Sequence, residues 1–279
     1  MRAIVFGATA SAETIYEEIK KKYNIVAFVD NDASKQGEGM GGIPIVSPSN
    51  IESLFWDEII IVSTSAMEAI KKQLLEMGIP ERKINTRYVD LRVIPRRKFC
   101  EDFASVIYSK NIFGCIAEAG VFQGEFAAVM NENFPDRKLY LFDTFEGFDQ
   151  RDVVIEEKHQ YSDAKAGDLN ITSEILVLNK MPHPENCIIK KGYFPKTTSG
   201  IDEKFCYVNL DMDLYKPTLE GLRFFYPLMV EGGIITIHDY FSQGYEGVNA
   251  ALEEFMNEVQ DNIVPFPIGD NVSIAIQRQ

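Results

Sequence analysis

The segment with the clearest chemical content is LDMDLYKPT, residues 210–218, in which Asp211 and Asp213 follow an apolar run typical of a buried strand. An ionised carboxylate is costly to remove from water unless it is paired, hydrogen-bonded or bound to a cation. The next strand-like run ends in His238 and Asp239. Each of these residues alone fits helix capping or a structural hydrogen bond. Together they favour a site for a divalent cation such as Mg²⁺ or Mn²⁺.

A second group of residues suggests a nucleoside ligand. Glu118, Gly120 and Gly124 follow a strand-like run in AEAGVFQGE, and Asp143 ends the next such run. Strand–helix packing alone explains such glycines, and turn capping alone explains the aspartate. In combination, a glycine-rich turn and an acid about 20 residues later favour an adenosine-type ligand whose ribose the acid binds. The spacing is looser than GxGxxG and the chain has no GKS/T, so S-adenosylmethionine (SAM), which needs no phosphate cradle, fits best.

These residues can meet only if the strands that carry them end at one edge of a sheet. After residue 110, strand-like and helix-like runs alternate, which predicts an α/β fold with ligands at the carboxyl ends of parallel strands. The tail predicts a C-terminal antiparallel hairpin that turns at GDN. Residues 149–185 read as an irregular polar lid, in which His159 and His183 are candidates for substrate contact.

The first part of the chain has its own strand and helix alternation, which predicts a small parallel sheet and a Rossmann-like domain over residues 1–92, followed by a second domain over 93–279. Its glycine turn, GATASA, keeps only Gly7, because Ala12 stands at the last glycine's place. Asp30 still ends the second strand. The lost glycines favour partner docking, dimerisation or a degenerate role over a tightly bound dinucleotide.

Composition limits the partners. The chain has 279 residues, a net charge of -14 and a pI of about 4.8, which argues against nucleic acid as the main partner. No apolar stretch approaches the ~18 residues of a membrane span, and the four cysteines form no CxxC pair. We therefore expect a soluble, cytoplasmic protein with reduced thiols and no membrane partner. A homo-oligomer stays open.

Three segments resemble a known family. AEAGVFQGEFAAVM, LYLFDTFEGF and LDMDLYKPTLEGLRFFYPLMVEGGIITIHDY are similar to the TylF/MycF family of macrocin-type sugar O-methyltransferases, over roughly residues 100–279. The resemblance implies a class I SAM-dependent methyltransferase fold. It also implies that Asp143 binds the ribose of SAM and that the turn at Gly120 and Gly124 passes under its methionine part.

The same resemblance implies a divalent metal that binds hydroxyls of the substrate sugar. Asp211 would be a metal ligand and the general base, and Asp239 a second ligand. His238 stands where the family tends to have an aspartate. Imidazole can bind the same metals, although one negative charge is lost. The N-terminal segments resemble the Rossmann-like domains that precede many polysaccharide-modifying enzymes.

The sequence therefore predicts a SAM-dependent, metal-assisted O-methyltransferase that acts on a sugar hydroxyl of a polysaccharide or glycosylated metabolite. One alternative is a nucleotide-sugar oxidoreductase or epimerase that uses the N-terminal fold, although this region has no clear Tyr-x-x-x-Lys pair. The other is a non-catalytic SAM-binding scaffold.

Overall fold

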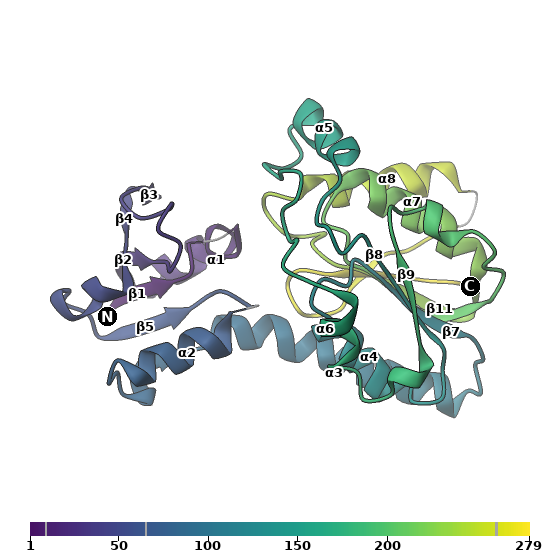
Figure 1. Ribbon diagram of the computed structural model, residues 1–279, viewed down its shortest axis with the longest axis horizontal. Helices are drawn as coiled ribbons and strands as arrows, with labels where there is room; N and C mark the ends of the chain where they lie inside the picture. Colours follow the sequence, from purple (N-terminus) through teal and green to yellow (C-terminus); the bar gives the residue numbers. More distant parts are fainter. Residues whose placement is uncertain (9, 65, 260–261) are drawn as a thin grey trace. The chain divides into compact units, whose positions relative to one another are not determined.

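Short apolar runs such as EIII, residues 58–61, form the N-terminal sheet because β-branched side chains pack well on a pleated surface that is covered on both faces. The structure is a computed structural model that describes residues 1–8, 10–64, 66–259 and 262–279. The chain divides into two compact units, Met1–Ile94 and Pro95–Gln279 (Figure 1). Each unit has a sheet and a core of its own.

The N-terminal unit is a six-stranded sheet in the order β3-β4-β2-β1-β5-β6, parallel except for the β3–β4 pair. Its apolar side chains form two clusters. The elements are β1 (Arg2–Phe6), α1 (Ala10–Lys20), β2 (Asn24–Val29), β3 (Gly39–Met40), β4 (Ile43–Val46), β5 (Glu58–Ile61), α2 (Met67–Glu76) and β6 (Ile84–Asn85).

The helix α3 (Arg87–Ser109) runs across the predicted domain boundary between residues 92 and 93. The side chain of Asn85 accepts a hydrogen bond from the Arg87 N–H, at 2.9 Å, and Pro95 lies inside the helix. A proline within a helix removes one backbone hydrogen bond. Buried side chains lie on both sides of it, Val89 in the first unit and Cys100 in the second. Burial of both segments outweighs the local penalty.

The second unit is a seven-stranded sheet in the order β12-β13-β11-β10-β7-β8-β9. The five strands from β7 to β11 are parallel, and β13 runs antiparallel to both β11 and β12, as the GDN hairpin predicted. The strands are β7 (Cys115–Ala119), β8 (Leu139–Asp143), β9 (Cys187–Lys191), β10 (Phe205–Leu210), β11 (Met229–Ile237), β12 (Phe266–Pro267) and β13 (Ile274–Gln277).

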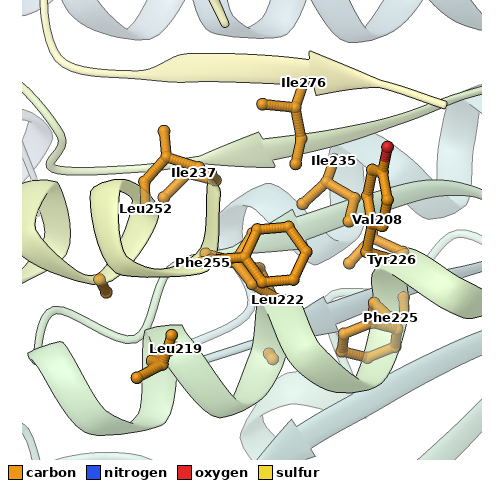
Figure 2. Packing of buried hydrophobic residues seen from close by; sticks show 14 of the residues in the cluster. Val208, Leu219, Leu222, Phe225, Tyr226, Ile235, Ile237, Leu252, Phe255 and Ile276 are labelled. Carbon is orange, nitrogen blue, oxygen red and sulfur yellow. The ribbon is translucent and has the colours of Figure 1, made fainter. Parts of the chain in front are cut away.

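Helices cover both faces of this sheet. In Figure 1, α7 (Tyr215–Phe225) and α8 (Glu246–Glu258) lie on one face, and α3 and α4 (Glu125–Asn133) on the other. Figure 2 shows how the first pair packs: Leu222 and Phe255 meet the strand residues Val208 and Ile235. A fully buried side chain of this size contributes about 1.5–3 kcal/mol. Every residue of β10 is buried, so packing holds the side chains on both faces of this strand in place.

The lid segment also differs from the prediction. Residues 149–185 contain two helices, α5 (Gln150–His159) and α6 (Glu174–Leu178), each with a side-chain N-cap, from Asp149 and Ser173. The apolar residues of α5, Val153 to Ile155, are consecutive, so the sequence shows no helical period there.

Two further predictions can be compared with the fold. All four cysteines are free. No helix in the described part of the chain has both the length and the apolar character needed to cross a membrane.

Candidate active site

The register of three strands brings the candidate residues together. In β10, Leu210 pairs with Ala119 of β7 and with Ile237 of β11, so the residues that follow these strands lie side by side. The Asp211 N–H donates to the Ala119 carbonyl, and the His238 N–H donates to the Leu210 carbonyl, each at 2.8 Å. One ligand atom each of Asp211, His238 and Asp239 lies within 4.8 Å of the others.

Within this cluster, His238 Nδ1 lies 3.1 Å from Asp211 Oδ1 and 2.8 Å from Asp239 Oδ2. Burial and the charge of Arg96 disfavour the imidazolium, but the two carboxylates outweigh them and raise the pKa of His238 to about 10. Burial opposes ionisation of Asp239, yet His238 holds its pKa below the usual range. The two carboxylates of this cluster are thus charged, and both contact the same nitrogen of the imidazole.

Asp213, the second acid after the apolar run of β10, lies outside the strand. The strand β10 ends at Leu210, and Asp213 has φ of 59°. Asparagine and aspartate tolerate this left-handed region better than most residues. Burial, followed by repulsion from Asp239 and Asp211, raises the pKa of Asp213 well above its usual range. The pKa of Asp213 is thus shifted in the direction opposite to that of Asp211, which, despite burial, His238 and Arg96 hold below the usual range.

A pocket that is open to solvent adjoins these residues. Gly120, Asp143, Asp211 and Asp213 line it, together with Tyr193 and other residues from the ends of β8 and β9 and from α5. The structure thus brings two of the predicted nucleoside residues, Gly120 and Asp143, and the predicted base to one cavity.

Asp143 first holds the glycine turn in place. Its Oδ2 accepts hydrogen bonds from the N–H groups of Val121 and Phe122, both at 2.8 Å, and its Oδ1 accepts one from Phe145 at 2.7 Å. A carboxylate has about four acceptor positions, so about one is left for a ligand in the pocket.

Gly120 is required by the chain itself. It has φ of 83°, and a Cβ atom there would lie 1.7 Å from the Asp211 carbonyl oxygen. The two strand ends approach each other at this point. Gly124 begins α4 with φ of 84°, and a Cβ atom there would lie 3.1 Å from Val177. Gly124 is absent from the pocket lining, so the structure does not bring it to the same cavity.

Glu118 lies beneath the pocket and is 1% exposed. Its Oε1 accepts a hydrogen bond from Asn209 Nδ2 at 2.9 Å, whereas its Oε2 has no hydrogen-bond partner among the described residues. Burial, followed by the charge of Asp211, raises the pKa of Glu118 well above its usual range. Glu118, like Gly124, is absent from the pocket lining, so the structure does not bring its carboxyl group to the same cavity.

Arg96 is a site residue that the sequence analysis missed. It lies on α3, more than 100 positions away from its partner Asp211, and its Nη2 donates to Asp211 Oδ2 at 2.8 Å. Nothing in the sequence around a basic residue of the helix before β7 indicates that it will contact Asp211. The two candidate histidines of the lid lie elsewhere: His159 stacks on Tyr161, and the ring of His183 lies 3.5 Å from Glu185.

The comparable acid of the N-terminal unit is enclosed by its own chain. Asp30 is 9% exposed and accepts hydrogen bonds from the N–H groups of Ala8, at 2.8 Å, and Asp32, at 2.9 Å. Lys35 Nζ donates to the Ala8 carbonyl and lies 3.5 Å from Asp30. Thr9, in the same turn, lies outside the described residues.

A parallel sheet with a pocket and acids at its carboxyl edge is the architecture expected of a class I SAM-dependent methyltransferase, and comparisons with known proteins give the family. Residues 93–272 match the family model described as Macrocin-O-methyltransferase (TylF). The chain belongs to this family and is a SAM-dependent O-methyltransferase. Residues 1–85 match a second model, described as C2185-like, N-terminal.

Two solved structures share the fold. The O-methyltransferase NovP is 17% identical, covers 78% of this chain and 100% of its own, and has a TM-score of 0.56. The calicheamicin methyltransferase CalS11 is 16% identical, covers 88% of this chain and 99% of its own, and has a TM-score of 0.53. Among curated proteins, no sequence matches significantly.

Proposed function

We propose that the enzyme methylates a sugar hydroxyl, with Asp211 as general base and with a divalent cation held by Asp211, His238 and Asp239. The observation that carries the proposal is the convergence of these three side chains within 4.8 Å, beside a pocket that Asp143 also lines. The family name and the similarity to NovP and CalS11 support the reaction class.

The residues present fit SAM. The acceptor position left on Asp143, which lines the pocket, suits a ribose hydroxyl. Gly120 leaves the end of β7 without a side chain where it lines the pocket. When bound, SAM supplies an electrophilic methyl group on a sulfonium.

The residues also fit a divalent cation. The imidazole nitrogen lies 2.8 and 3.1 Å from carboxylate oxygens, a spacing compatible with neighbouring ligands around one ion. Two carboxylates and one neutral imidazole would suit Mg²⁺ or Mn²⁺, and binding of the ion would release the proton that the raised pKa of His238 places on the ring. When bound, such an ion supplies Lewis acidity, which lowers the pKa of a hydroxyl.

Asp211 is suited to accept the proton. Its burial favours the neutral acid, but the charges of His238 and Arg96 outweigh burial and hold its pKa below the usual range, so it is ionised at neutral pH. In the reaction, the hydroxyl oxygen forms a bond to the methyl carbon, the bond from that carbon to sulfur breaks, and the hydroxyl proton passes to Asp211. The products are a methyl ether and S-adenosylhomocysteine.

The acceptor is a polysaccharide or a glycosylated metabolite. The family is described as a macrocin O-methyltransferase family, and CalS11 is described as a calicheamicin methyltransferase. The Rossmann-like N-terminal unit, by its resemblance to domains of polysaccharide-modifying enzymes, favours polysaccharide biosynthesis in the cytoplasm, with Mg²⁺ as the ion.

The test is a panel of free, methyl-glycosidic and nucleotide-linked hexoses and 6-deoxyhexoses, with formation of S-adenosylhomocysteine as the readout. We expect methylation of at least one sugar, loss of turnover with EDTA and recovery with Mg²⁺ or Mn²⁺. Calorimetry with SAM should show binding with or without the metal. Turnover that is unchanged by EDTA would overturn the role of the cation, and SAM binding without turnover on any sugar would favour the scaffold alternative.

A further inference from the structure

Arg96 has a constrained position next to the proposed base. Its Nη2 donates to Asp211 Oδ2 at 2.8 Å and also contacts Asn209 Oδ1 at 3.2 Å. The guanidinium carbon lies 4.1 Å from the centre of the Phe126 ring. The side chain is 13% exposed. A residue from α3 is therefore fixed against β10 by two oxygen acceptors and an aromatic face.

The surroundings of Arg96 are acidic. Three carboxyl groups interact electrostatically with the guanidinium: Asp211 after β10, Glu118 on β7 and Asp270 in the hairpin before β13. Among the described residues, His238 is the cationic group that faces it. Placing a guanidinium in a site of low exposure is costly unless its hydrogen bonds and charge are compensated. Here the compensation comes from groups of the active site, which ties the position of Arg96 to theirs.

The contact also decides which oxygen of Asp211 faces the site. Arg96 takes Oδ2, and Oδ1 is left 3.1 Å from His238 Nδ1. Without the guanidinium, Oδ2 loses this donor, and the contact of Oδ1 with His238 is left to orient the carboxylate. The second acceptor of Arg96 is Asn209 Oδ1, and two further hydrogen bonds hold the Asn209 side chain in place. Its Oδ1 also accepts from Thr236 Oγ1 at 2.9 Å, and its Nδ2 donates to Glu118.

We propose that Arg96 is a positioning residue for methyl transfer, which fixes the Asp211 carboxylate so that Oδ1 faces the acceptor hydroxyl and the cation cluster. This inference rests on the proposed role of Asp211 as base. Replacing a residue that orients a ligand or base through a hydrogen bond typically lowers activity about 10–100-fold. Lysine is not equivalent, because it lacks the planar guanidinium that lies over the Phe126 ring.

The experiment compares Arg96→Ala, Arg96→Lys and the control Lys98→Ala, an exposed ion-pairing residue on the same helix. With a sugar that the parent methylates, we expect kcat to fall about 10–100-fold for Arg96→Ala, with the Kd of SAM near the parent's value. Methylguanidinium added to Arg96→Ala should restore part of kcat, whereas methylammonium should not. Lys98→Ala should match the parent.

A merely structural role predicts a lower melting temperature without rescue by methylguanidinium, and that result would overturn the proposal. Arg96→Lys serves if Arg96→Ala does not fold: turnover at the parent's rate would also count against it. A crystal structure of Arg96→Lys adds a readout without turnover, because the orientation of the Asp211 carboxylate should change. If the parent methylates no sugar, the proposed function fails, whereas an active parent with equally active variants refutes only the role of Arg96.

Discussion

In each sheet an aspartate lies at the end of the second strand along the chain, but the surroundings of the two aspartates differ. Asp30 follows β2 and Asp143 ends β8, and each accepts the N–H groups of the turn after the first strand of its sheet. At Asp30, Lys35 bonds the same turn and lies 3.5 Å from the carboxylate. At Asp143 the carboxylate lines an open pocket.

The difference shows that an acid at this position first has a structural task. It closes the turn by taking backbone donors, and it contributes to ligand binding only where acceptor capacity remains and the chain leaves space in front of it. The acid of the N-terminal unit meets the first condition of a nucleotide site but is covered by its own lysine. This supports a docking or degenerate role for that unit over dinucleotide binding.

The largest expected effect distinguishes the proposed base, Asp211, from the turn acid of the N-terminal unit, Asp30. Asp211→Asn keeps the size and removes the proton acceptor, so we expect kcat to fall about 10²–10⁴-fold, with SAM still bound. Asp30→Asn should leave kcat unchanged. Stopped assays of S-adenosylhomocysteine and calorimetry with SAM measure the two quantities. Equal losses of kcat in both variants would contradict the separation of the two units' roles.

Glycine substitutions test the two turns. Gly120→Ala places a Cβ atom 1.7 Å from a backbone oxygen, whereas in Gly7→Ala the nearest atom is a side-chain carbon of Ser63 at 3.2 Å. Both residues have positive φ, a strain of about 1–3 kcal/mol for alanine. We expect the larger loss of unfolding free energy for Gly120→Ala, because backbone must move. Denaturant unfolding of both variants gives the order, and a reversed order would refute the close approach.

Asp143→Asn should weaken SAM binding without stopping turnover at saturating SAM. The amide retains one acceptor oxygen and loses the charge, and a hydrogen bond to a charged group is worth about 1.5–3 kcal/mol. We therefore expect the Kd of SAM to rise about 10–100-fold. The matched variant Asp30→Asn should bind SAM like the parent. An unchanged Kd in Asp143→Asn would mean that the carboxylate only closes the turn.

The smallest expected effect concerns Glu156 on α5, which is fully buried and accepts the N–H of Tyr215, at the start of α7, and the Ser162 hydroxyl. Burial raises its pKa above the ordinary value. Between the unfolded and the folded pKa, the folded state holds a proton that the unfolded state has lost, so stability falls as pH rises through this window.

Glu156→Gln keeps an acceptor without this titration. Its unfolding free energy relative to the parent should therefore increase as pH rises through the window. Glu156→Ala leaves two donors unpaired and should cost about 1–3 kcal/mol. Urea unfolding at several pH values measures both effects, and a pH-independent difference between parent and Glu156→Gln would refute the assignment.

Much of the fold was predictable because the strands are short apolar runs with clear boundaries. The runs that became β7, β8, β10 and β11 were identified, and so was the terminal hairpin. The course of α3 through Pro95 was not, because a proline normally indicates an end. The helix α5 was missed because its apolar residues show no helical period. In both places, burial outweighed a weak or contrary local signal.

The sequence by itself determined that acids end the strands, since a charge that follows a buried apolar run must lie at the rim of the sheet. Only the tertiary structure decided which of these acids meet and what they meet. The register of β7, β10 and β11 brought Asp211, His238 and Asp239 within 4.8 Å, and the path of α3 brought Arg96 to Asp211. The physical reason is range: hydrophobic patterning acts over a few neighbouring residues, whereas pairing of charges requires a distance in space that residue spacing along the chain does not encode.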